Sequence, residues 1–193
     1  MHDRALAPTG YDNCELESAF AYMLRLLTAA LTVALAVFSS IQVTTAFPSL
    51  TSSILTRTGS IVPARQVVGP ELYLICLLQI ILAAAFLIAP YAAADSIHFG
   101  PWCLGRYTAE KRDRILPSLR ELMGLLALLI SLCFAGRIYF RIHDARSHGP
   151  LLPVDWLDRV VRTDLESLLA LGLVGWLVIY YYLGKFDELA GKE

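Results

Sequence analysis

Side chains that could bind a metal lie close together in one short polar segment. His143, Asp144 and His148 supply imidazole nitrogens and a carboxylate, which are common zinc ligands. Their spacing matches no closed zinc pattern, so we interpret the segment as a solvated turn. The other two histidines, His2 and His98, also lie outside the apolar segments, which argues against an intramembrane haem with two axial histidines. We predict no metal site and no bound cofactor.

The sequence contains no motif of a known catalytic chemistry. A phosphate-binding glycine loop, a dinucleotide-binding glycine pattern, a zinc-protease helix and a serine nucleophile elbow are all missing. Proton pumps and transporters usually place a carboxylate deep inside a helix bundle. Here, the ionisable residues in or beside the apolar segments lie only near the ends of those segments: Arg25, Arg137, Asp164 and Glu166. We therefore predict no catalytic residue.

The elements that hold these side chains are four long apolar stretches. None of the four contains Asp, Glu, Lys or Arg: Leu26–Thr56, Leu72–Ala94, Leu122–Gly136 and Ser167–Gly184. A helix needs about 20 apolar residues to cross a bilayer core. Only 17% of the 193 residues are charged, compared with about 25% in soluble domains. We predict an all-α polytopic membrane protein, a single domain over residues 1–193, with four spans at about 20–46, 72–94, 120–140 and 164–184.

One or two amphipathic helices are expected at the membrane surface. Asp155 can cap a helix over residues 156–163, whose apolar stripe faces away from Arg159 and Arg162. Such a stripe predicts a helix lying in the headgroup plane, with Trp156 as its interfacial anchor. A second amphipathic segment, from Thr108 onward, is predicted to lead into the third span. Between these two helices, we expect residues 141–153 to form a polar turn.

Further polar and aromatic residues are candidates for contacts with lipid or with neighbouring helices. Arg25 and Arg137 can extend their charged groups to the membrane surface, and Gln79 can form a hydrogen bond between spans. Trp176 and Tyr180 are expected in an aromatic belt at the end of the fourth span. Arg137 and Tyr139 are predicted to line a groove between the third and fourth spans.

The distribution of basic residues gives a slight preference for one orientation. The side that carries both termini has nine Lys and Arg residues, and the opposite side has seven. Because basic loops tend to stay inside, cytoplasmic termini are favoured. The net charge of −1 gives no indication of nucleic-acid binding. A composition rich in Ala, Leu and Arg suggests a bacterial source, so we expect a multi-pass protein of the bacterial inner membrane.

The connection before the third span also carries a family resemblance. Its residues include Ser96-Ile97-His98-Phe99, Tyr107-Thr108-Ala109-Glu110-Lys111-Arg112 and Leu116. With these residues, the segment 95–140 is similar to a stretch in uncharacterised bacterial membrane proteins that share a domain with the immunity protein of the sporulation-delaying toxin system. The resemblance implies a membrane protein of unknown or toxin-immunity role, and it assigns no functional residue.

Taken together, these patterns favour a protein that interacts rather than catalyses. The leading hypothesis is a non-enzymatic accessory or interaction subunit of a larger membrane complex, whose partners are the lipid bilayer and other membrane subunits. Toxin immunity or envelope signalling is an alternative that rests on the resemblance. A small transporter, or a membrane enzyme acting on a lipid or quinone, is a further alternative that would use the groove near Arg137 and Tyr139.

Overall fold

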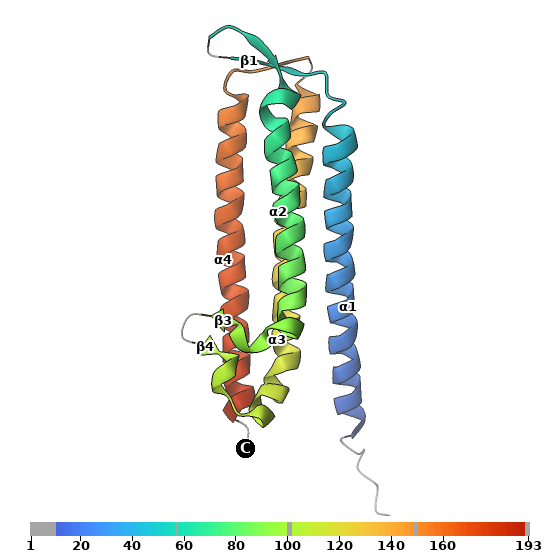
Figure 1. Cartoon of the computed structure of the whole chain (residues 1–193), viewed down its shortest axis with the longest axis vertical. Helices are drawn as coiled ribbons and strands as arrows, with labels where there is room; N and C mark the ends of the chain where they lie inside the picture. The colour runs from blue at the N-terminus through green and yellow to red at the C-terminus, as the bar shows by residue number, and fades with distance from the viewer. Residues whose placement is uncertain (1–10, 57, 100–101, 149, 192–193) are drawn as a thin grey trace, which may run out of the picture.

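Four long helices run side by side and form an elongated bundle (Figure 1). The computed structural model describes residues 11–56, 58–99, 102–148 and 150–191, with side chains from residue 21 onward except that of Leu157. The helices are α1 (Tyr11–Ile41), α2 (Ala64–Ala92), α3 (Ala109–Ser147) and α4 (Trp156–Gly191). A short π-helical segment, η1 (Gln42–Ala46), extends α1. The abundance of Ala and Leu, both strong helix formers, explains these long uninterrupted elements.

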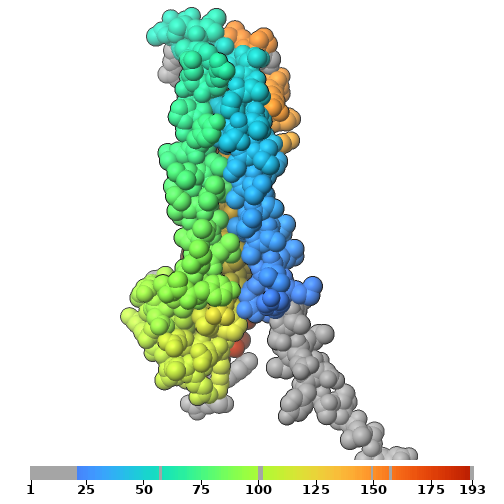
Figure 2. Space-filling model, turned by 45° about the vertical axis from the view of Figure 1, so that its right-hand side comes forward, coloured from blue at the N-terminus to red at the C-terminus, as the bar shows by residue number. Residues whose placement is uncertain are grey.

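All four helices are long and apolar enough to cross a membrane, which confirms the predicted all-α class. The candidate spans are Ala21–Ala46, Ala64–Ala92, Ala109–Ser147 and Asp158–Gly191. Helix α3 is the central element, because α1, α2 and α4 all pack extensively against it. Figure 2 shows α1 and α2 side by side along the length of the bundle. Helix α4 packs mainly against α3 and forms one flank of the molecule.

A small sheet closes the end of the bundle opposite the C-terminus. Strands β1 (Ser53–Leu55) and β2 (Ile61–Pro63) pair in antiparallel fashion, and β5 (Leu151–Leu152) adds to β1 in parallel. The sheet thereby joins the α1–α2 connection to the α3–α4 connection. Its Ile54 and Leu152 lie opposite each other in register and belong to a buried cluster that also holds Trp156.

The other end of the bundle is built from the α2–α3 connection. It contains short 3₁₀ turns at Ala94–Ser96 and Leu104–Arg106 and the antiparallel pair β3 (His98–Phe99) and β4 (Trp102–Cys103). This connection widens the molecule at that end (Figure 2). Its buried residues pack with the first turns of α3 and the last turns of α4, around Leu104, Ile115 and Phe186.

The predicted interfacial helix at residues 156–163 is wrong, because these residues are the first turns of α4. Trp156 is completely buried and donates a hydrogen bond from its indole nitrogen to Asp144 Oδ2 at 2.5 Å. It therefore anchors the core and does not contact lipid. Trp156, Val160 and Asp164 are all buried, and their spacing of four residues places them on one face of the helix. That face packs inward, so the helix follows the bundle instead of the membrane surface.

Two other boundaries differ from the predicted ones. Helix α3 continues to Ser147, so most of the predicted turn at residues 141–153 is helical. Helix α2 begins at Ala64, although dense Ser and Thr and three prolines predict a loop over residues 47–70, and it includes Glu71. Polar residues and prolines made both segments look like loops. Arg141 and Glu71 are accommodated inside helices because they pair with each other between α3 and α2. The predicted lead-in to the third span is helical, as the start of one continuous helix from Ala109, and its place at the membrane surface stays a prediction.

Candidate functional site

A cluster of four charged residues joins three helices near the end closed by the sheet. Arg137 and Arg141 lie one turn apart on α3, Asp164 comes from α4 and Glu71 from α2. Arg137 Nε lies 2.9 Å from Asp164 Oδ1, and Arg141 Nη1 lies 3.1 Å from Glu71 Oε2. Arg141 Nη2 also donates to Asp164 Oδ2. Asp164 is therefore shared by two guanidinium groups.

The charged cluster is buried on the side of α3 and open on the side of α2. The side chain of Arg141 is 3% exposed and that of Asp164 11%, whereas Glu71 is 47% exposed. Two positive and two negative charges balance formally, which is the arrangement that makes buried charges tolerable. Among the described residues, Arg141 Nε has no hydrogen-bond partner. The arrangement fixes α2, α3 and α4 relative to one another and leaves only Glu71 accessible.

A neutral polar contact lies deeper in the bundle. Gln79 of α2 is completely buried and donates from Nε2 to the backbone carbonyl oxygen of Ser131 on α3 at 3.2 Å. This is the predicted hydrogen bond between spans. It holds α2 against α3 within the charge-free stretches 72–94 and 122–136 of the two helices.

A second ion pair joins α3 and α4 near the other end. Lys185 Nζ lies 3.5 Å from Glu121 Oε2 and 5.5 Å from the centre of the Tyr182 ring. Between the two ion pairs, α3 and α4 carry no charge over residues 122–136 and 167–184. At 1.5 Å per residue these segments are roughly 22 and 27 Å long. The charge-free zone is thus close to the thickness of a bilayer core, about 30 Å.

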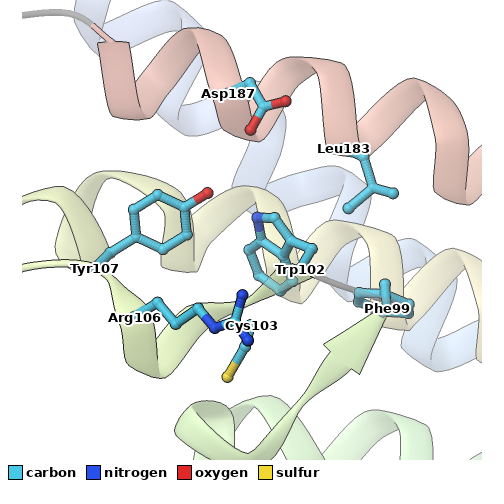
Figure 3. A pocket seen from close by; sticks show the side chains of 7 residues that line it. All are labelled: Phe99, Trp102, Cys103, Arg106, Tyr107, Leu183 and Asp187. Atoms are coloured by element: carbon cyan, nitrogen blue, oxygen red, sulfur yellow. The ribbon is translucent and has the colours of Figure 1, made fainter.

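A cavity of about 320 Å³ lies beside the β3–β4 pair and the last turns of α4 (Figure 3). Aromatic rings from the α2–α3 connection form one wall, and α4 contributes Leu183 and Asp187. The indole nitrogen of Trp102 and the hydroxyl of Tyr107 lie on the side that faces Asp187 (Figure 3). Among the described residues, Trp102 Nε1 has no hydrogen-bond partner, although Trp102 is only 8% exposed. Cys103 Sγ lies 3.7 Å from His98 Nε2.

A second cavity of about 300 Å³ is an apolar groove between α3 and α4. Leu126 and Ile130 line it from α3, and Gly172, Gly175 and Trp176 line it from α4. Nothing lies within 4 Å of the position that a side chain at Gly172 would occupy. The glycines thus leave the groove open along α4.

The predicted groove lined by Arg137 and Tyr139 is wrong. Arg137 belongs to the charged cluster. Tyr139 stacks on His143 with ring centres 5.7 Å apart, and its ring also lies 6.3 Å from that of Phe38 on α1. Tyr139 therefore faces α1, whereas the actual groove on the α4 side is apolar.

The other predicted contact residues lie apart from one another. Arg25 donates from Nε to the carbonyl oxygen of Ala21 in its own helix at 3.1 Å. Arg159 forms an exposed ion pair at 3.2 Å with Asp155, the residue before α4, and Arg162 forms one at 3.1 Å with Glu166 within α4. Trp176 stacks on Tyr180 at 5.7 Å, and both are largely exposed. In the part of the chain that is described, no group of three His, Cys, Asp or Glu residues could hold a metal.

Sequence reasoning missed Arg141, Glu71, Trp102 and Asp187. Arg141 lies in the predicted polar turn, and Glu71 lies just before the second predicted span. A signal for Arg141 existed, since Arg137 and Arg141 are four residues apart and would share a helix face. No local pattern links Trp102 to Asp187, because their proximity depends on how the α2–α3 connection folds back on α4.

Comparison with protein-family models, with curated proteins and with solved structures finds no match to this chain. The resemblance of residues 95–140 to the family related to the toxin-immunity protein therefore stays a prediction. Any function must be inferred from the geometry of the charged cluster, the cavity and the groove.

Proposed function

We propose that this chain is a multi-pass integral membrane protein that acts as a non-enzymatic interaction subunit and docks a partner membrane helix along α4. Membrane insertion is supported by four helices of sufficient length and apolarity. It is also supported by ion pairs that border a charge-free zone of bilayer thickness on α3 and α4. Cytoplasmic termini follow only from the basic-residue count. The bacterial inner membrane follows only from composition.

The observation that carries the docking proposal is Trp176. It lies near the middle of the charge-free part of α4, not at the end where the predicted aromatic belt would place it, and it is 59% exposed. Tryptophan favours the edges of a bilayer, where its N–H finds polar partners. At mid-depth in lipid that N–H would have none, which is unfavourable. A partner helix seated against Trp176 would cover the ring and supply an acceptor.

The surroundings of Trp176 fit a helix better than they fit lipid chains alone. The groove beside it is lined by Gly172 and Gly175, and small residues allow close backbone approach between membrane helices. In the most apolar part of α4 only 6% of residues are buried, compared with 44% in α3. Helix α4 thus has the largest membrane-facing surface left to cover.

Co-purification from native membranes in mild detergent tests this proposal. We expect a stoichiometric partner to be retained by the wild-type chain and lost by Trp176→Leu and by Gly172→Leu, because both changes reshape the groove without adding charge. Phe38→Leu on α1 is the matched control, since it changes an exposed aromatic residue on another helix. A partner retained equally by Trp176→Leu, or no stoichiometric partner at all, would contradict docking along α4.

A transporter, or an enzyme acting on a lipid or quinone, is the second candidate. It is favoured by one observation, the buried charged cluster with its accessible Glu71. Ionisable residues inside a membrane are often functional. Every charged side chain of the cluster forms an ion pair, however, so the cluster also holds α2, α3 and α4 together. A chain that purifies alone and stays monodisperse would favour this second candidate over the interaction subunit.

A further inference from the structure

The cavity near the C-terminal end of α4 lies where lipid headgroups would be. Leu183 is in the last turn of the charge-free part of α4, and Asp187 is one turn beyond it. The cavity therefore extends from the edge of the apolar zone into the polar zone. Its volume, about 320 Å³, is at the lower end of the range for small-molecule sites. A ligand that is apolar at one end and charged at the other fits this position.

The charged groups of the cavity have opposite signs. Asp187 on α4 and Arg106 on the α2–α3 connection both line it, and both are exposed. They lie on different sides of the Trp102 ring (Figure 3). A carboxylate and a guanidinium held apart in this way complement a ligand that carries a cation and an anion. Arginine is well suited to phosphate because its donors form a planar fork.

The aromatic wall distinguishes between types of cation. The Trp102 ring packs against Phe186 at 4.8 Å, Phe99 at 5.9 Å and Tyr107 at 6.1 Å between ring centres. Because its neighbours cover Trp102, the rings do not form the open cage that a quaternary ammonium group requires. A primary ammonium group, in contrast, can donate hydrogen bonds to the Asp187 carboxylate.

We propose that this cavity binds the headgroup of a zwitterionic phospholipid with a primary ammonium group, of the phosphatidylethanolamine type. Asp187 binds the ammonium group, Arg106 binds the phosphate, and Leu183 contacts the start of the acyl chains. The site lies at the opposite end of α4 from the charged cluster. It does not involve the groove beside Trp176, so it goes beyond the proposed docking function and does not depend on it.

Native mass spectrometry of the full chain in detergent micelles tests the proposal. The purified protein is titrated with phosphatidylethanolamine, phosphatidylcholine and phosphatidylglycerol of identical acyl chains, and with glycerophosphoethanolamine as the soluble headgroup. We expect phosphatidylethanolamine to bind tightest. Asp187→Asn should weaken its binding about tenfold, and Arg106→Gln should weaken phosphatidylethanolamine and phosphatidylglycerol by similar factors.

Two controls separate the site from general lipid affinity. Glu188→Gln removes the same charge from the neighbouring exposed position, and Arg162→Gln removes an exposed arginine at the other end of α4. Both should bind phosphatidylethanolamine like the wild type, and circular dichroism should show that all four variants are folded. The proposal is overturned if Asp187→Asn binds as well as Glu188→Gln or if phosphatidylcholine binds as tightly as phosphatidylethanolamine. It is also overturned if glycerophosphoethanolamine binds as tightly as the lipid.

Discussion

An ion pair joins α3 to α4 near each end of the bundle, but the two pairs differ in their burial. At each end an ion pair joins α3 to α4: Arg137 with Asp164 at 2.9 Å, and Glu121 with Lys185 at 3.5 Å. At the first end both side chains are nearly buried, with 12% and 11% exposed. At the second, Lys185 is 39% exposed. Burial removes water as an alternative partner for the charged groups. The first pair therefore constrains the arrangement of the helices, and the second constrains it much less.

The chain connections at the two ends also differ in how completely they are packed. At the end of the charged cluster, a three-stranded sheet joins two connections and covers Trp156, Leu152 and Ile54. At the other end, the β3–β4 pair leaves a cavity beside α4 and an unpartnered indole nitrogen at Trp102. One end is thus filled and fixed, and the other has space for a ligand. This difference indicates where stability and binding can be altered separately.

The largest expected effect follows from removing the shared carboxylate. Asp164→Ala leaves Arg137 and Arg141 without their common partner, and only Glu71 still faces Arg141. Breaking a buried ion pair by removing one partner costs about 3–5 kcal/mol. We expect the free energy of unfolding, measured by denaturant titration in mixed micelles, to fall by that amount.

The matched control for Asp164→Ala is Glu166→Ala, two residues away on the same helix. Among the described residues, Glu166 pairs with the exposed Arg162, so its removal should leave the free energy of unfolding unchanged within error. Similar losses for the two variants would show that the end with the charged cluster is no more constrained than an exposed helix surface.

A smaller effect is expected from Trp156→Phe. The change keeps an aromatic ring but removes the hydrogen bond from Nε1 to Asp144 Oδ2. A hydrogen bond to a charged group contributes about 1.5–3 kcal/mol, and we expect a loss of stability in that range in the same titration. Trp102→Phe is the comparison at the open end. Because its Nε1 has no partner among the described residues, it should cost clearly less. A larger loss for Trp102→Phe would reverse the assignment of filled and open ends.

The sequence predicted the four apolar helices well, because charge-free length is a direct requirement of a bilayer. It failed where charges lie inside helices. Arg141 fell in the predicted polar turn, Glu71 just before the second predicted span and Asp164 at the start of the fourth, since a single charged residue beside an apolar segment usually marks its end. Their pairing depends on three separate helices meeting at one level. No pattern within one helix predicts that meeting.

The candidate sites were predictable only in part. Gln79 was correctly expected to form a hydrogen bond between spans, because a lone amide in an apolar helix has few other partners. Trp156 was misassigned, since the same stripe with Val160 that suggested a membrane-surface helix also fits a face packed on a protein core. Periodicity identifies an apolar face but does not say what covers it. The cavity required Trp102 and Asp187 to come together from distant parts of the chain.

The smallest expected effect is that of Lys185→Met. This change removes the ion pair with Glu121 and the contact with the Tyr182 ring. Because Lys185 is partly exposed, water already competes for its ammonium group in the folded protein. We therefore expect the free energy of unfolding to fall by about 1 kcal/mol or less.

A double-mutant cycle for each ion pair makes the comparison quantitative. The Glu121–Lys185 cycle uses Glu121→Gln and Lys185→Met, and the Arg137–Asp164 cycle uses Arg137→Met and Asp164→Asn. Each cycle isolates a coupling energy between its two side chains. We expect the coupling of Arg137 with Asp164 to exceed that of Glu121 with Lys185 severalfold, because only the first pair is shielded from water on both sides. Equal coupling energies would mean that burial does not distinguish the two ends, and the contrast between a fixed end and an open end would fail.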